Sequence, residues 1–196
     1  MKKIIILMLC PFFLIAAACN DDDNDDDQDD ASDLTFTLSS IAIDENGELL
    51  DAYKCEEKVD GIENSIPLSW ENVPEEANSL AVIMHHYPNA DDPTEINSYL
   101  LLWDIDPTVV EIPYGTADDG DWFMGTNKDG NAISYTSPCS PSTGSHEYII
   151  TLYALSETPP DLPDSSSVDV DYDTMINAIS TVTIIDEAVL TFNDVN

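Results

Sequence analysis

The chain has 196 residues, of which 40 are Asp or Glu and only five are Lys or Arg, so its formal net charge is −35 at pH 7. Nucleic-acid binding requires basic side chains that neutralise phosphates, so this composition rules strongly against a nucleic-acid partner. It also argues against docking on anionic lipid head groups, which attract basic surfaces.

The N-terminus carries the pattern of an export signal. Two lysines follow Met1, and an uncharged apolar run over residues 4–18 comes next. This run is too short to span a bilayer comfortably but suits a signal-peptide core, so we predict a signal peptide at residues 1–18. The run ends in three alanines before Cys19, which resembles the bacterial lipobox, whose cysteine receives a diacylglycerol. An ordinary secretory signal with an incidental Cys19 is the alternative.

An acidic stretch follows Cys19. Residues 20–30 read NDDDNDDDQDD, and such a segment has nothing to bury and repels itself, so we predict that residues 19–33 form a lipidated cysteine and a disordered tether. An acidic run after a lipidated cysteine resembles the surface-export signal of Bacteroidetes lipoproteins, with a plain solvated linker as the alternative. We therefore expect an exported lipoprotein, anchored in the bacterial outer membrane and displayed on the cell surface.

The region over residues 34–196 has the length of one domain and the pattern of a mainly β protein. Short β-branched and aromatic runs alternate with long polar loops, which predicts a β-sandwich. One helix is expected over residues 174–180, with Asp173 as its N-cap. The predicted strands lie at 34–38, 79–84, 99–103, 147–154 and 187–192.

Two cysteines remain in the region after the anchor, Cys55 and Cys139. In an oxidising compartment an even pair suggests a disulfide. The sequence does not show that the two residues are close, so two separate buried thiols remain the alternative at this point.

Two stretches of the chain carry motifs that go beyond composition. The first reads SIPLSWENVP from Ser65 and continues with SLAVIM from Ser79. The second reads GTNKDG from Gly125, then SPCSP from Ser137, GSHEY and LYAL. In order and spacing they resemble the phosphatidylethanolamine-binding protein family, in its bacterial Raf-kinase-inhibitor-like branch, which reads SPPLSW, NVP, SLALI, GPCPP, HRY and LYAL. The resemblance spans about residues 34–195 and implies a β-sandwich with a small anion-binding pocket at one end.

The resemblance also indicates which residues line that pocket. The family's CPP turn falls on residues 139–141, its HRY histidine on His146, and its HWV histidine position on Tyr99. Its DPDAP loop falls on residues 85–90, where neutral side chains replace both acids, and the HRY arginine has become Glu147. The resemblance further implies a Cys55–Cys139 disulfide beside the pocket. The predicted ligand-binding residues are His86, Tyr87, Asn89, Tyr99, Pro141 and His146.

Three histidines are the strongest candidates for chemistry. Neighbouring side chains of a strand point to opposite faces, so at most one of His85 and His86 is expected to face inward, and His86 shares the parity of Met84. A His86–His146 pair with Tyr99 as third ligand would be a metal site, but the spacing matches no metal motif, so we expect hydrogen-bonding or ligand-binding roles and no metal.

The leading hypothesis is a surface-anchored lipoprotein that binds a small ligand, with an anionic or phosphate-bearing head group, in the pocket. The alternative is a protein-interaction or inhibitor module that acts on a protease or kinase-like partner. A metal-dependent enzyme is third. We expect no catalysis and no cofactor, because the sequence has no GxSxG elbow and no basic residue close in sequence that would activate a thiol of Cys139 toward His146.

Overall fold

The computed structural model describes residues 34–55, 63–89, 92, 94–139 and 143–195. The expected signal peptide, Cys19, the acidic tether and Pro141 lie outside these residues. Within them, no helix is both long and apolar enough to cross a membrane.

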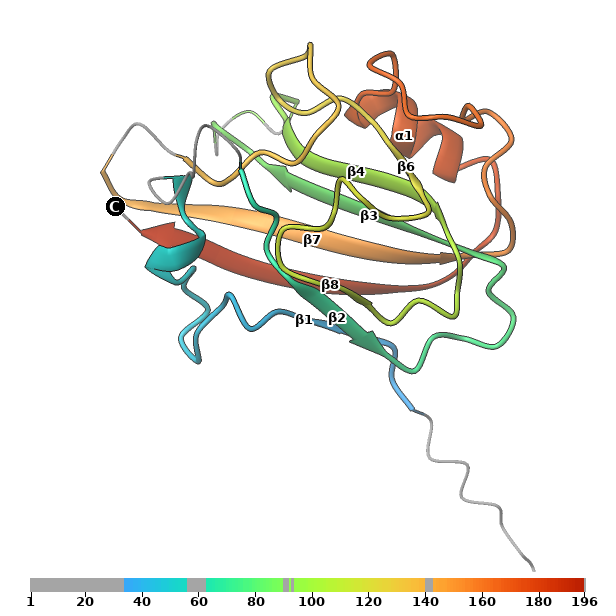
Figure 1. The fold of residues 1–196 in the computed structure, drawn as a ribbon, viewed down its shortest axis with the longest axis horizontal. Helices are drawn as coiled ribbons and strands as arrows, with labels where there is room; N and C mark the ends of the chain where they lie inside the picture. Colours follow the sequence, from blue (N-terminus) through green and yellow to red (C-terminus); the bar gives the residue numbers. More distant parts are fainter. Residues whose placement is uncertain (1–33, 56–62, 90–91, 93, 140–142, 196) are drawn as a thin grey trace, which may run out of the picture. The chain divides into compact units, whose positions relative to one another are not determined.

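In the part of the chain that the structure describes, eight strands form two antiparallel sheets, and Figure 1 shows the smaller sheet lying over a face of the larger one. This arrangement confirms the predicted sandwich. The larger sheet has the order β6 (Phe123–Met124), β4 (Asn97–Ile105), β3 (Ser79–His86), β7 (Ser145–Leu155) and β8 (Ile184–Val195). The smaller sheet has the order β1 (Thr37–Ser39), β2 (Leu68–Glu71) and β5 (Glu111–Ile112).

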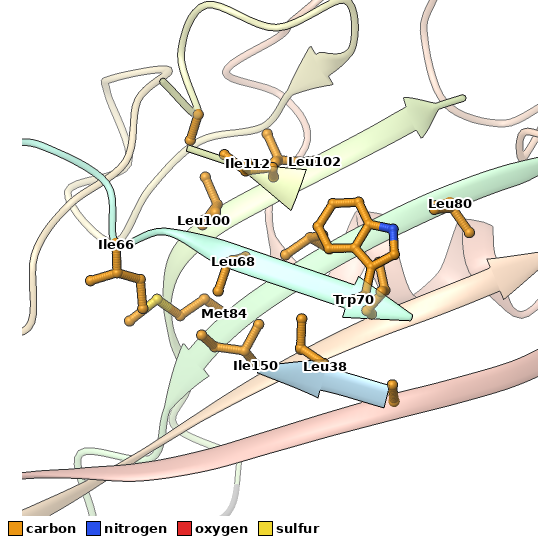
Figure 2. Close-up of a cluster of buried hydrophobic side chains, with 14 of the residues drawn as sticks. Leu38, Ile66, Leu68, Trp70, Leu80, Met84, Leu100, Leu102, Ile112 and Ile150 are labelled. Carbon is orange, nitrogen blue, oxygen red and sulfur yellow. The ribbon is translucent and has the colours of Figure 1, made fainter. Parts of the chain in front are cut away.

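The main hydrophobic core lies between the two sheets. In β2, Leu68 and Trp70 are buried while the residues between and after them are exposed, which is the period-two pattern of a strand with one covered face. The Trp70 indole N–H donates to the Val109 carbonyl oxygen over 2.8 Å, so its polar edge is satisfied inside the core. Figure 2 shows this core, with Leu80, Met84, Leu100, Leu102 and Ile150 of the larger sheet opposite Leu38, Ile66, Leu68, Trp70 and Ile112.

A second core covers the opposite face of the larger sheet. Here α1 (Tyr172–Ile179) packs its buried residues, among them Met175, against Ile83 and Trp103 of the sheet. The helix therefore begins two residues earlier than predicted. Its N-cap is Asp171 rather than Asp173, because the Asp171 carboxylate is the group that accepts a hydrogen bond from the Thr174 N–H, over 2.8 Å.

Both faces of β3 are covered, so all eight of its residues are buried. This explains why the sequence pattern of β3 is a continuous apolar run rather than an alternation. It also corrects the expectation for the adjacent histidines. His86 lies on the face of Met84, toward the main core, and His85 is nevertheless buried as well, on the face of Ile83.

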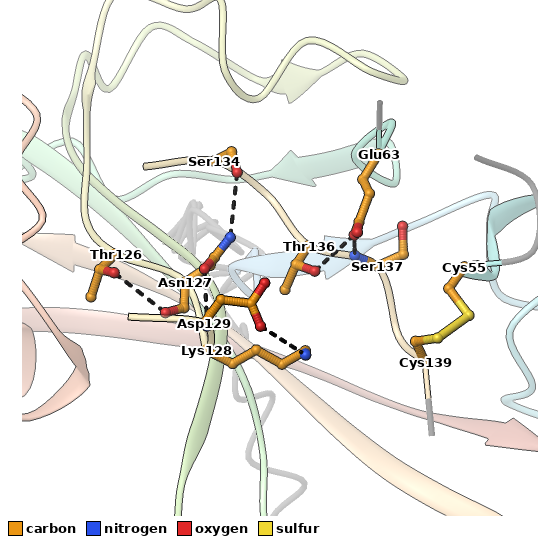
Figure 3. A network of polar contacts seen from close by, with 10 residues as sticks. All are labelled: Cys55, Glu63, Thr126, Asn127, Lys128, Asp129, Ser134, Thr136, Ser137 and Cys139. Carbon is orange, nitrogen blue, oxygen red and sulfur yellow. Dashed lines mark hydrogen bonds and ion pairs between the residues drawn. A yellow bond between two sulfur atoms is a disulfide. The ribbon is translucent and has the colours of Figure 1, made fainter. Parts of the chain in front are cut away.

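A disulfide joins Cys55 to Cys139, as the resemblance implied, with Cα atoms 5.2 Å apart. Cys55 follows the short 3₁₀ helix η1 (Asp51–Tyr53), and its N–H donates to the Pro138 carbonyl oxygen over 3.2 Å. Figure 3 shows Glu63 next to this bridge, where its carboxylate accepts from the Thr136 hydroxyl over 2.8 Å and from the Ser137 N–H. The chain leading into Cys139 is thus held by covalent and polar bonds.

Candidate functional site

The candidate site lies where β3 ends and β7 begins. An antiparallel pair places the end of one strand beside the start of the other. His86, the last residue of β3, is the direct cross-strand partner of Tyr148 in β7. His146 is two residues before Tyr148, so it projects from the same face of β7. Strand pairing therefore brings two histidines that are 60 positions apart in the sequence to the same corner.

These residues surround a pocket of about 400 Å³. The size falls in the range of sites that bind small molecules. Of the six residues predicted from the sequence, the pocket contains four, and Pro88, Ser145 and Glu147 were not predicted. The lining residues are His86, Tyr87, Pro88, Asn89, Ser145, His146 and Glu147.

The two imidazoles are in ring contact at the pocket wall. The ring centroids of His86 and His146 are 5.9 Å apart, and the rings are nearly perpendicular at 79°. The His86 Nδ1 is 2.7 Å from the Glu147 carbonyl oxygen. Because a carbonyl only accepts, Nδ1 carries the proton that it donates to Glu147, and Nε2 is the other polar atom of the ring.

Tyr148 forms the support behind the histidines, and sequence reasoning did not single it out. Its ring stacks on His86 at 4.8 Å and on Phe192 at 5.4 Å, so it links the pocket wall to the main core. Burial raises the pKa of the Tyr148 hydroxyl, which therefore stays protonated at neutral pH. Tyr148 could have been identified only from its cross-strand pairing with His86. That pairing depends on the register of β3 against β7, which the sequence does not give.

Tyr99 does not line the pocket surface. It is 3% exposed and packs edge-on against Tyr148 with a centroid distance of 5.0 Å, on the side away from solvent. Burial raises the pKa of Tyr99 as well. The structure therefore places Tyr99 beneath the site.

His85 lies on the opposite face of the sheet from the pocket. It is 6% exposed and sits between the rings of Tyr87, at 5.1 Å, and Tyr172, at 5.3 Å. Burial, together with the neighbouring imidazole of His86, lowers the pKa of His85 from 6.5 to about 4. His85 is therefore neutral at physiological pH, and its surroundings are those of a structural residue.

The bond between Cys55 and Cys139 bears on the catalytic and metal alternatives. The Cys139 sulfur is engaged in the disulfide, so it does not offer a thiolate to His146. Within residues 34–55, 63–89, 92, 94–139 and 143–195, no three His, Cys, Asp or Glu side chains are grouped as a metal site. The arrangement suits ligand recognition by hydrogen bonds and ring contacts.

Comparison with known proteins agrees with this architecture. The family model for phosphatidylethanolamine-binding protein matches residues 39–193. A UPF0098 protein of Methanothermobacter thermautotrophicus is 34% identical over 137 residues, which cover 68% of this chain and 85% of that protein. A UPF0098 protein of Pyrococcus abyssi is 34% identical over 121 residues, which cover 58% of this chain and 63% of that protein.

Solved structures show the same fold. A phosphatidylethanolamine-binding protein homologue of Chlamydia trachomatis superposes with a TM-score of 0.68 and 26% identity, covering 82% of this chain and 97% of that one. YbcL of E. coli, described as a member of the mammalian family, has a TM-score of 0.65 at 22% identity and covers 82% of this chain and 98% of its own. The chain belongs to the phosphatidylethanolamine-binding protein family.

Proposed function

We propose that the folded domain binds a small ligand with a phosphate-bearing head group in the pocket between β3 and β7. The observation that carries the proposal is the convergence of His86 and His146, with ring centroids 5.9 Å apart, on a pocket of about 400 Å³. Because the Nδ1–H of His86 is held by the Glu147 carbonyl, the donor that this ring offers a phosphate oxygen is the Nε2–H of its protonated form. The name of the family points to the same class of ligand.

The charges around the pocket narrow the ligand further. In the part of the chain that the structure describes, no lysine or arginine lines the pocket, and Glu147 does. Glu147 stands between His146 and Tyr148 in β7, so its carboxylate leaves the other face of the strand, and its backbone carbonyl, bonded to His86, borders the pocket. Among the described lining residues a phosphate alone therefore finds no cationic side chain to balance its charge, whereas a zwitterionic head group carries its own ammonium group. We therefore propose a phosphoethanolamine-type head group rather than a free phosphate.

Calorimetric titration of the chain from Asn20 onward with O-phosphoethanolamine, inorganic phosphate and ethanolamine tests this assignment. We expect O-phosphoethanolamine to bind most tightly and His146→Ala to weaken it at least tenfold. The control is Glu111→Gln, which changes an exposed acid of β5 in the smaller sheet and should leave binding unchanged. The proposal would be contradicted if His146→Ala bound O-phosphoethanolamine as tightly as the unmodified protein does, or if none of the three probes bound.

We also propose that the domain is exported and held at the bacterial outer membrane by acyl chains on Cys19, facing the cell exterior. The apolar run, the small residues before Cys19 and the acidic run after it support this location. One acylated cysteine with two or three chains anchors stably. Labelled palmitate should enter the wild-type chain and not Cys19→Ser, and external protease should remove the domain from intact cells. Labelling of Cys19→Ser, or full protection from protease, would contradict the location.

A protein-interaction or inhibitor module is the second candidate. It is favoured by one observation: where the family has two acids and an arginine, this chain has Tyr87, Asn89 and Glu147. Such changes weaken the binding of a small anion, but they leave a concave surface on which a protein partner can dock. If all three probes fail in the titration and a purified protease or kinase is inhibited, this candidate replaces the first. Neither candidate involves catalysis.

A further inference from the structure

The inference concerns β8, the outer strand of the larger sheet. Strand β8 pairs with β7 on one side in a regular antiparallel register from Asp186 to Val195. An outer strand has a second edge, where backbone N–H and C=O groups lack a neighbouring strand. The side chains along this edge and the bonds at its two ends show what it can accept.

Asn193 establishes which backbone groups of β8 point outward. Its N–H donates to the Gly47 carbonyl oxygen over 2.8 Å, and its own carbonyl oxygen accepts from the Leu49 N–H over 2.8 Å. The backbone of Asn193 therefore faces away from β7. Because the direction alternates along a strand, Thr191, Val189 and Glu187 also direct their N–H and C=O groups to the outer edge.

This outer edge is closed at both ends. At one end, Asn193 is paired with the segment that contains Glu48. At the other end, the Glu187 N–H donates to the carboxylate of the preceding residue, Asp186, over 2.8 Å. This second bond confirms that the Glu187 N–H points away from β7. A side chain that caps an edge N–H in this way protects the strand from unwanted pairing.

Between these closures lies a stretch without a hydrogen-bonded neighbour in the described residues, which we call the β8 gap and define as Val189 and Thr191; β1 packs near β8 on the side of the main core. In residues 34–55, 63–89, 92, 94–139 and 143–195, no backbone group is hydrogen-bonded to either residue on the outer side. Val189 is 53% exposed and Thr191 is exposed. A β-branched pair with free backbone groups is the surface that accepts an added strand.

We propose that the β8 gap binds an extended peptide segment as an additional strand, and that the segment has alternating β-branched residues and a lysine or arginine at each end. Charge complementarity supports the basic ends. The exposed acids Asp186 and Glu187 flank one end of the gap, and the exposed acids Glu48 and Glu147 lie at the other end. The gap has room for a segment of about five to seven residues, at about 3.3 Å per residue.

A second copy of the chain is a poor occupant of the gap. Each copy has a formal net charge of −35. Antiparallel pairing of two β8 edges would also set Asp186 and Glu187 of one copy against Glu48 and Glu147 of the other, and like charges at short range are destabilising. Basic ends on a foreign segment avoid this repulsion, so the same charges that disfavour a dimer select the partner.

The test uses the full chain purified in detergent and the synthetic peptide acetyl-KTVTVTK-amide. In ¹H–¹⁵N NMR spectra we expect the amide signals of Val189 and Thr191 to shift on titration, with weak affinity that falls as salt is raised. Alternate N–H groups of a strand point to opposite edges, and an added strand pairs with β8 through only one of them. N-methylation of the peptide nitrogens that face β8 should therefore abolish binding, while N-methylation of the alternate nitrogens, which face away, should leave binding unchanged. A peptide with glutamate in place of both lysines should bind at least tenfold more weakly.

Val189→Lys should lower the affinity for the basic peptide at least tenfold, because the new lysine repels the lysines of the peptide at the gap. The matched control is Val110→Lys, at a residue that is 56% exposed and belongs to the loop before β5. Equal weakening by both variants, or binding that neither set of N-methyl groups affects, would overturn the proposal. Reversible dimers in sedimentation equilibrium that Val189→Lys dissolves would also overturn it, because a second copy would then be the occupant.

Discussion

Reduction of the Cys55–Cys139 disulfide gives a quantitative prediction for stability. The two cysteines are 84 positions apart, so the bond closes a long loop of the unfolded chain. In the chain-entropy model a loop of this length contributes about 4.5 kcal/mol to the free energy of unfolding at 25 °C. This is a large fraction of the about 5–15 kcal/mol that a domain typically has, so the reduced protein should be markedly easier to unfold.

The assay is urea denaturation of the chain from Asn20 onward, which contains these two cysteines and no others. We expect a reducing agent to lower the free energy of unfolding by about 4.5 kcal/mol and to raise the slope with urea, because the reduced unfolded chain exposes more surface. The control is the double variant Cys55→Ser with Cys139→Ser. Its free energy of unfolding should equal that of the reduced protein and should not change when the reducing agent is added. A change below about 1 kcal/mol would refute the entropic reasoning.

Three further changes probe packing and charge. Gly125→Ala should destabilise by about 2 kcal/mol, because the added methyl group overlaps the Val170 carbonyl oxygen, and unchanged urea midpoints would contradict this. The pKa of His85 is lowered from 6.5 to about 4 in the folded protein, so as the pH falls the unfolded state binds this proton before the folded state does. The free energy of unfolding should therefore decrease between pH 6.5 and about pH 4, by about 3 kcal/mol at most. His85→Phe should remove that part of the slope, and an unchanged slope would contradict the assignment. Lys54→Met should cost about 3 kcal/mol, because the Lys54 ammonium lies 3.6 Å from the carboxylate of Asp194, whose side chain is 1% exposed. Equal thermal stability of the two proteins would contradict that value.

Most of the fold follows from sequence patterns that are local. The run at 79–84 is long and apolar enough to identify a strand, and the structure extends it only to His86. The strands β5 and β6 have two residues each, which is too short for any periodicity, so they could not be predicted. The helix start was placed two residues late because Asp171 and Asp173 are both suitable caps, and only the geometry distinguishes them.

The site depends on pairings between distant segments, and the sequence predicts these less well. The resemblance placed His86 and His146 correctly at one pocket, because both belong to motifs with fixed positions in the family. It did not reveal that Tyr148 separates Tyr99 from the pocket, since that follows from the register of β3 against β7. The burial of His85 depends on the second core around α1, which no local pattern near His85 indicates.

The central claim is that the end of β3 and the start of β7 form a ligand pocket with two histidines in its wall. Because the chain has three histidines, imidazole ¹H–¹³C NMR during titration with O-phosphoethanolamine tests it directly and contains its own control. We predict that the signals of His86 and His146 shift together and saturate, while the signal of His85 stays in place. Saturable binding that leaves His86 and His146 unshifted, or that shifts His85 alone, would contradict the claim.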